Sequence, residues 1–88
     1  MVIGDMLKLT CKGSESTVEI KWKKNGALVT SRANIKKQGI RTSTLVVEEV
    51  EISDSGNYSC EAHNQAGFMS STVEIKVRGK SINMRVLS

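Results

Sequence analysis

Proline is absent from this chain of 88 residues, and histidine, tryptophan, tyrosine and phenylalanine each occur once. Without proline, the chain offers no proline-rich docking motif. The lone histidine, His63, gives no basis for a histidine-based catalytic triad. Phe68 by itself is no stacking platform for bases, so we expect no nucleic-acid partner. These absences favour a function that uses neither catalysis nor base recognition.

Long hydrophobic runs are also missing, and no segment approaches the length needed to span a membrane. The first ten residues contain no basic head followed by an apolar stretch, so no secretion signal is visible. We therefore expect an excised piece of a larger protein, with neighbouring domains in the parent chain and Met1 as an expression start.

The chain is long enough for a single domain, and its composition is that of an ordinary globular protein, with 39% hydrophobic and 25% charged residues. A domain of this size buries only about two-thirds of the surface that its unfolded chain exposes. A covalent crosslink would therefore contribute a large share of its stability.

Helical periodicity is lacking, and apolar residues alternate with polar ones along short segments. Asn25-Gly26 predicts a tight hairpin, because both residues tolerate positive φ. The expected strands are 6–11, 18–23, 27–30, a short edge strand around Ile35, 44–47, 57–63 and 70–77. The alternation predicts these buried side chains: Leu7, Leu9, Cys11, Val18, Ile20, Trp22, Leu45, Val47, Val50, Ile52, Tyr58, Cys60, Ala62, Val73, Ile75 and Val77. This pattern indicates an all-β, two-sheet antiparallel sandwich with Greek-key connections.

Cys11, Trp22 and the run Asp54-Ser55-Gly56-Asn57-Tyr58-Ser59-Cys60 stand in the order that one family of sandwiches uses for its core. With them, the chain from Gly4 to Val77 resembles an immunoglobulin domain of the I-set, or intermediate, type. Gly4 to Cys11 is similar to that family's entry into its second strand, and Leu45-Val46-Val47 to its fifth. The stretch from Cys60 to Gly67 resembles the hairpin between its last two strands.

The resemblance implies a disulfide between Cys11 and Cys60 that packs against Trp22, with Tyr58 and Leu45 in the core. It also implies that Tyr58 donates its hydroxyl to nearby backbone in a tyrosine corner and that Asp54 and Gly56 shape the preceding turn. A buried reduced pair would leave the same cysteines in the sequence, so the redox state stays open. A metal site would need two more ligands, and no metal or cofactor is expected.

Only three residues precede Gly4, so we expect the family's first strand, strand A, to be truncated and a sheet edge to be exposed. The predicted domain covers residues 1–79. Residues 80–88 are expected to form a C-terminal tail or linker.

Three groups of surface residues are candidates for function. Asn57-Tyr58-Ser59 fits the N-glycosylation pattern, with Asn57 pointing outward. Phe68 and Met69 place large apolar side chains near a loop tip and could contact a partner. The net charge of +4 raises a third candidate, a basic surface for polyanions such as heparan sulfate that includes Lys21, Lys23, Lys24, Lys36 and Lys37.

Three functions are compatible with these features. The first is a non-catalytic protein-interaction module of a cell-surface or secreted protein, similar to adhesion molecules and receptor ectodomains. The second is a structural spacer in an intracellular cytoskeletal or muscle protein of the titin type. The third is a heparan sulfate-binding module. An extracellular location is the first expectation and a cytoplasmic, cytoskeleton-associated one the alternative, because the cysteines could serve either.

Overall fold

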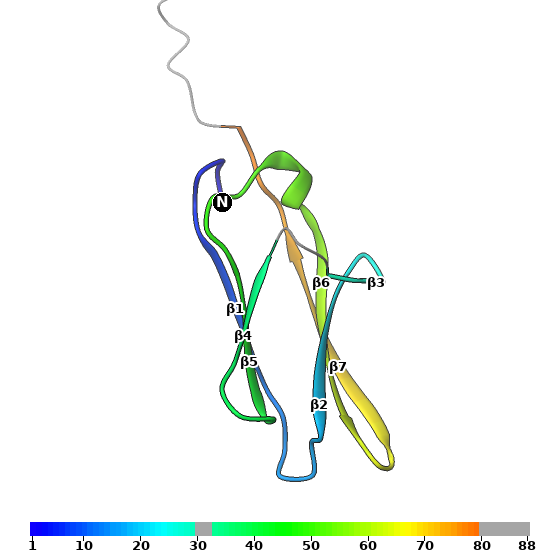
Figure 1. The fold of residues 1–88 in the computed structure, drawn as a ribbon. Coiled ribbons are helices and arrows are strands. Elements are labelled where there is room, and N and C mark those ends of the chain that lie inside the picture. The colour runs from blue at the N-terminus through cyan, green and yellow to red at the C-terminus, as the bar shows by residue number, and fades with distance from the viewer. Residues whose placement is uncertain (30–32, 80–88) are drawn as a thin grey trace, which may run out of the picture.

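A computed structural model describes residues 1–29 and 33–79 of the chain. In this part of the chain two antiparallel sheets face each other, one ordered β1-β5-β4 and the other β3-β2-β6-β7 (Figure 1). The elements are β1 (Leu7–Lys12), β2 (Glu19–Lys24), β3 (Ala27–Leu28), β4 (Asn34–Lys37), β5 (Thr42–Val47), the 3₁₀ turn η1 (Ile52–Asp54), β6 (Gly56–Asn64) and β7 (Gly67–Ile75). The expected all-β sandwich is confirmed.

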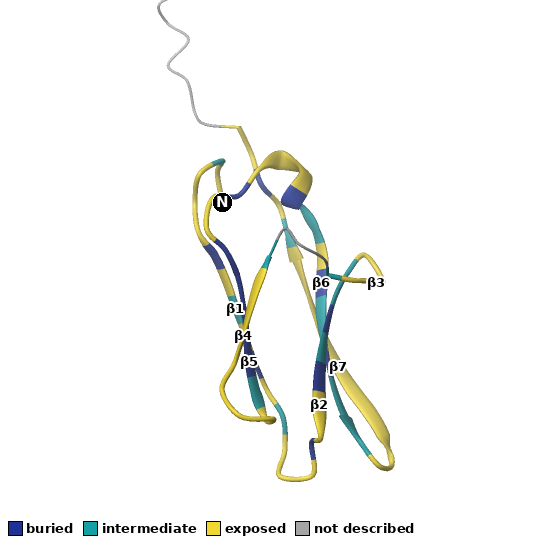
Figure 2. Ribbon diagram, in the orientation of Figure 1, coloured by how far each residue is buried: buried dark blue, intermediate teal, exposed yellow. Residues whose placement is uncertain are grey.

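The core lies between the sheets and is built from the inward side chains of both. Figure 2 marks buried residues on strands of each sheet. Leu45 is fully buried, and Trp22 is only 5% exposed. The indole Nε1 of Trp22 donates to the Ser43 hydroxyl at 2.9 Å, so the one polar atom of this ring is satisfied across the sandwich. Cys11 and Cys60 form a disulfide with Cα atoms 6.4 Å apart. The two sheets are thus joined covalently beside the indole.

Tyr58 ties the start of β6 to the turn before it. Its hydroxyl donates to the carbonyl oxygen of Asp54 at 2.6 Å. The buried Asp54 carboxylate accepts the backbone N–H of Glu51 at 2.7 Å, which closes the single turn of η1. A short helical turn therefore occupies a segment for which the sequence showed no helical pattern. Local side-chain-to-backbone hydrogen bonds can form such a turn without amphipathic periodicity.

The Asn25-Gly26 turn joins β2 and β3 with φ angles of 53° and 85°, as a tight hairpin of this type requires. Asn25 also bonds to the neighbouring strand, because its Oδ1 accepts the N–H of Asn57 at 2.9 Å. A Cβ on Gly56 would lie 2.8 Å from that same Oδ1. Gly56, whose φ is 152°, therefore leaves room for the asparagine that links the two segments.

Three side chains predicted to be buried are exposed: Val18 by 56%, Ile52 by 51% and Val73 by 43%. Val18 precedes β2 at an open end of the sandwich, although its N–H still donates to the His63 carbonyl. Ile52 lies on η1 rather than in a strand. Val73 points inward like Tyr58, its partner in β6, but it lies on β7 at the edge of the sheet. Alternation predicts which way a side chain points and not whether another layer covers it.

The expected truncation of the first strand is confirmed. Ahead of β1, the pairing within the described residues is a single parallel bridge between Val2 and Arg78. The N–H of Ile3 donates to the Arg78 carbonyl at 2.9 Å, and the N–H of Arg78 donates to the Met1 carbonyl at 3.0 Å. Residues 80–88, predicted to form a tail or linker, lie outside the described residues. In the described chain, no helix is long and apolar enough to cross a membrane.

Candidate interaction face

The outer surface of the four-stranded sheet carries a connected group of polar and aromatic side chains. Strand register places Lys21 of β2 opposite Glu61 of β6, and His63 of β6 opposite Phe68 of β7. Paired residues in an antiparallel sheet point to the same face, so side chains from three strands meet there. We call this surface the Glu61 face; it comprises Glu19, Lys21, Lys23, Glu61, His63 and Phe68.

Glu61 lies at the centre of this face and is only 8% exposed, although it is charged. One carboxylate oxygen pairs with the Lys23 ammonium at 2.9 Å. The other lies 3.0 Å from His63 Nε2. The hydrogen bond from Lys23 is the main cause that lowers the pKa of the Glu61 carboxyl, with a further contribution from the His63 hydrogen bond. Glu61 therefore stays ionised, and its carboxylate holds the side chains of Lys23 and His63 in place.

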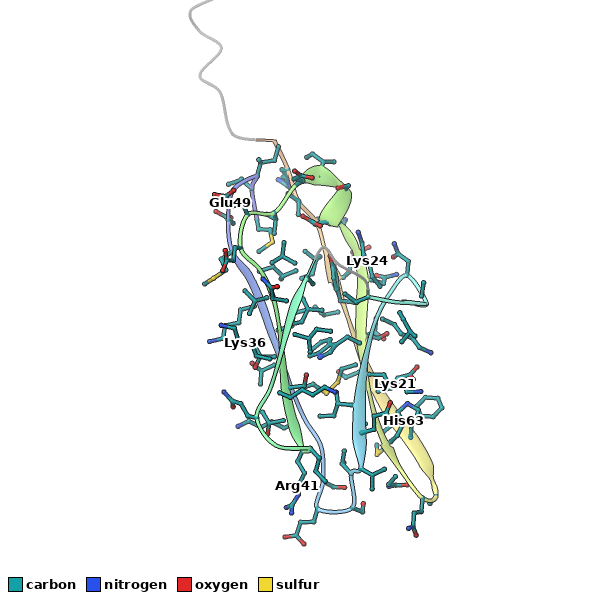
Figure 3. The ribbon with its side chains drawn as sticks, viewed as in Figure 1. Lys21, Lys24, Lys36, Arg41, Glu49 and His63 are labelled. Carbon is teal, nitrogen blue, oxygen red and sulfur yellow. A yellow bond between two sulfur atoms is a disulfide. The ribbon has the colours of Figure 1, made fainter. Side chains whose placement is uncertain are left out.

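Phe68 extends this arrangement toward the β6–β7 hairpin. Its ring stacks on the imidazole of His63 with centroids 4.9 Å apart, yet 56% of the residue remains exposed. The chain of contacts thus runs from Lys23 through Glu61 and His63 to an exposed aromatic ring. Figure 3 shows Lys21 and His63 on the same side of the molecule.

Met69, predicted together with Phe68 as a contact residue, points to the other side of the sheet. It pairs with Ala62, whereas Phe68 pairs with His63, and consecutive strand residues face opposite ways. Met69 is 81% exposed and lines a hollow between β7 and β1. The structure therefore assigns the two predicted contact residues to different surfaces.

The five lysines proposed as a polyanion site are divided between the two sheets. Lys21 and Lys23 lie on β2, whereas Lys36 and Lys37 lie on β4 in the other sheet (Figure 3). Lys23 pairs with Glu61, and Lys24 donates to the backbone carbonyl of Ser53. The sequence clustered these residues because β2 and β4 are close along the chain, but the crossover places the two strands in opposite layers.

Asn57 is exposed near the start of β6. It lies four residues before Glu61 on the same strand, so its side chain points to the same outer face of the sheet. Its place in the fold is compatible with a glycan, and its modification remains a prediction. Within residues 1–29 and 33–79, no group of three or more histidine, cysteine, aspartate or glutamate side chains could hold a metal ion.

Sequence reasoning missed the Glu61 cluster. Alternation places Glu61 and His63 on one face, and that signal was available. The pairing with Lys23 depends on the register between β2 and β6, which the sequence did not provide.

The chain belongs to the immunoglobulin I-set domain family, whose model matches residues 1–77. It is 33% identical over 85 residues to Hemicentin-2 of Mus musculus, and the matched region covers 96% of this chain and 2% of that protein. The fibroblast growth factor receptor of Halocynthia roretzi is 30% identical over 70 residues, 80% of this chain and 9% of the receptor. The muscle M-line assembly protein unc-89 of Caenorhabditis elegans is 33% identical over 72 residues, 80% of this chain and 1% of that protein.

The fold is also similar to solved immunoglobulin domains. The crystal structure of the Dscam1 Ig7 domain, isoform 5, superposes with a TM-score of 0.81 at 28% identity and covers 89% of this chain and 84% of that one. The chain spans less than a tenth of each of the three relatives, so they show the family and fold of one domain. Family members occur both in receptors and in muscle proteins.

Lowering the pH tests the central carboxylate of the Glu61 face. Because the folded-state pKa of Glu61 is lowered, ionised Glu61 stabilises the fold above the usual carboxyl range, and this contribution is lost as the pH falls through the folded pKa. We expect Glu61→Gln to be less stable than the wild type at pH about 7, and the difference to shrink at about 3. Urea unfolding at both pH values measures it.

The matched control is Glu19→Gln, whose carboxylate is 53% exposed and lies 3.7 Å from the Lys21 ammonium. A solvent-exposed pair of this kind contributes little. We expect Glu19→Gln to leave the stability nearly unchanged at both pH values. A Glu61→Gln deficit that persists unchanged at acid pH would show that lost packing, and not lost charge, is responsible.

Proposed function

We propose that this domain is a non-catalytic protein-interaction module of a cell-surface or secreted protein of the adhesion or receptor type. It binds its partner through the Glu61 face. The observation that carries the proposal is Phe68, a ring that is more than half exposed and yet held by stacking on His63. Aromatic side chains that are ordered before binding are typical anchors of protein interfaces, because little conformational entropy is lost on contact.

The charge pattern around Phe68 supports recognition of a protein surface. Glu19, Lys21, Lys23 and Glu61 lie on the same face of the sheet as Phe68, so charges of both signs accompany the exposed ring. Protein interfaces place polar and charged residues in a rim beside such aromatic anchors. The rim supplies specificity and orientation more than affinity.

The disulfide and the similarity to a receptor favour an extracellular parent protein. Disulfides persist in oxidising compartments, where they stabilise small domains. Thiol titration of protein from its native source tests this location, and free Cys11 and Cys60 thiols would contradict it. A glycan on Asn57, detected by mass spectrometry, would exclude the cytoplasm.

A second candidate is a spacer or binding domain of an intracellular muscle protein. The 33% identity to the M-line assembly protein favours it. In that role the cysteines would be reduced in the cell, and the two sheets would be held by packing alone.

Binding of the disulfide-intact domain to arrayed proteins tests the proposal. The array carries receptor ectodomains and, separately, sarcomeric proteins, so the two candidate functions give different results. Specific binding to an ectodomain is expected to weaken at least tenfold with Phe68→Ala, about 1.4 kcal/mol. Ile40→Ala removes an apolar side chain that is 61% exposed in the loop between β4 and β5, and it is the matched control. Binding that is insensitive to Phe68→Ala, or confined to sarcomeric proteins, would contradict the proposal.

A further inference from the structure

Charge divides unevenly between the two sheets. Among the described residues, the strands of the four-stranded sheet contain three lysines and three glutamates. The described strands of the three-stranded sheet contain no acidic residue and four lysines: Lys8, Lys12, Lys36 and Lys37. The excess positive charge of the strands therefore belongs to one layer of the sandwich.

Two of these lysines point outward from β1. Cys11 and Ser43 face the core, because Cys11 forms the disulfide and Ser43 accepts the indole N–H of Trp22. Lys8 and Lys12 alternate with the inward residues of β1 and are exposed. Successive side chains of a strand point to opposite faces, so both lysines lie on the outer face of the three-stranded sheet.

Lys36 points to the same side from β4. It pairs with Thr44 of β5, and Thr44 pairs with Thr10 of β1, so these three side chains form a row across the sheet. Figure 3 shows Lys36 on the side of the molecule opposite Lys21 and His63. We call this surface the lysine face; it includes Lys8, Thr10, Lys12, Lys36, Thr44 and Val46.

The three lysines surround the two threonines. Lys8 and Lys12 are four positions apart on one strand, so their Cα atoms are about 13 Å apart. Lys36 lies two strands from Thr10, a separation of about 10 Å. The hydroxyl oxygens of Thr10 and Thr44 are 3.4 Å apart, and when Thr44 donates, the exposed Thr10 hydroxyl keeps its hydrogen for an oxyanion. The lysine face thus offers three cations and a hydroxyl donor to one extended anion.

The lysines of this face have no carboxylate partner among the described residues. The ion pairs that lysines form there lie on the four-stranded sheet or just beyond it: Lys21 with Glu19, Lys23 with Glu61 and Lys76 with Glu74. An anionic ligand would therefore meet ammonium groups that no neighbouring carboxylate neutralises.

The two ends of the lysine face differ in charge. Glu48 and Glu49 follow β5 and are exposed beside the start of β1, so they limit the positive field at that end. At the other end, the Arg41 carbonyl accepts the N–H of Gly13 at 2.7 Å, which places Arg41 beside the end of β1. Figure 3 shows Arg41 at this end of the sandwich. Glu15 follows further along the β1–β2 loop.

The side chains of the lysine face favour a sulfated polysaccharide over other polyanions. Val46 is the one apolar outward side chain of these three described strands and is only 8% exposed. The face therefore presents no apolar anchor for a protein interface or a membrane. The same strands contain no aromatic residue on which bases could stack. Sulfate groups spaced along a polar chain require only cations and hydroxyl donors.

We propose that the lysine face binds a linear sulfated glycosaminoglycan, with sulfate groups against Lys8, Lys12 and Lys36 across Thr10. Of the five lysines predicted from the sequence as a polyanion site, this surface includes Lys36 alone. It lies on the opposite outer surface from the Glu61 face, so the domain can hold a protein and a polysaccharide together. The proposal therefore does not rest on the proposed function.

Titration of a heparin dodecasaccharide into the disulfide-intact domain tests the proposal. At about 0.15 M salt, we expect a Kd of about 100 µM or lower. Lys12→Gln with Lys36→Gln is expected to weaken binding about tenfold or more. The matched control, Lys24→Gln with Lys76→Gln, removes the same charge from β2 and from the chain after β7. It is expected to weaken binding by less than about threefold, because screening limits distant charges.

A second pair of variants adds charge in place of removing it. Thr10→Glu puts a carboxylate between the three lysines and is expected to weaken heparin binding about fivefold or more. Thr72→Glu adds the same charge to β7 in the other sheet and is expected to bind heparin nearly as the wild type does. Both threonines are exposed, and circular dichroism confirms that each variant is folded.

Three results overturn the proposal. One is a wild type that fails to bind heparin at about 1 mM. The second is an equal loss for the two lysine pairs, which would show that net charge alone attracts heparin. The third is tighter binding to a single-stranded oligonucleotide, or to vesicles with about 30% phosphatidylserine, than to heparin. The vesicles matter because Met6, ahead of β1, is 59% exposed.

Discussion

Replacing both Cys11 and Cys60 with alanine is expected to lower the free energy of unfolding by about 4 kcal/mol. The disulfide joins residues 49 positions apart, so it closes a loop of about 50 residues in the unfolded chain. Removing it restores the conformational entropy of that loop. A domain of this size is stable by only about 5–15 kcal/mol in total, so the reduced form is close to the limit of folding. Urea unfolding followed by the fluorescence of the single tryptophan, Trp22, measures the change.

Two comparisons separate loop entropy from lost packing. The wild type reduced with a phosphine reagent retains both sulfur atoms, whereas Cys11→Val with Cys60→Val retains volume without sulfur. If the entropy of the loop dominates, both lose about as much stability as the alanine variant. If reduction of the wild type leaves the midpoint of unfolding unchanged, the crosslink does not stabilise this domain. Such a result would suit a domain that functions in a reducing compartment.

Replacing Trp22 with alanine is expected to cost about 3–5 kcal/mol through lost burial and the cavity left behind. The ring is 5% exposed and packs in the same core cluster as Leu45 and Cys11. The change also leaves the Ser43 hydroxyl without the indole N–H that it accepts at 2.9 Å. An unsatisfied buried polar group adds about 1–3 kcal/mol when water cannot replace its partner. Circular dichroism in urea measures the loss, since this variant has no tryptophan.

Ser43→Ala removes the hydrogen bond and keeps the indole, so it should cost much less than the loss of the ring. Leu28→Ala removes a large apolar side chain that is 61% exposed, and we expect it to change the stability by less than about 0.5 kcal/mol. Should Trp22→Ala prove no more harmful than Leu28→Ala, the indole would not be part of the core.

Much of the fold was predictable from local pattern. Leu7 and Cys11 on β1 alternate with polar residues and are buried as expected. Leu45 and Val47 on β5 are also buried as expected, although Val46 between them is apolar and buried as well. Alternation works because successive side chains of a strand point to opposite faces, whatever the strand pairs with. The Asn25-Gly26 turn was predictable for a similar local reason, since few residues adopt its positive φ angles.

Exposure at the sheet edge and the ends of the sandwich was not predictable in this way. Val73 and Val18 point inward like core residues and are nevertheless exposed. Among the described residues, no strand covers Val73, and Val18 lies ahead of β2 at an end of the sandwich. Whether a side chain is buried depends on which other element packs against it. The sequence of a single strand does not contain that information.

The sequence by itself determined that this chain is an all-β sandwich of the immunoglobulin I-set family with Cys11, Trp22 and Cys60 in one core. Only the tertiary structure decided which side chains lie together on each surface. It separated Lys21 from Lys36, joined Lys23 to Glu61 and sent Met69 and Phe68 to opposite faces. The physical reason is that surface clusters depend on strand order and register. Both are set by contacts between residues far apart in the chain, and such contacts leave little trace in local sequence.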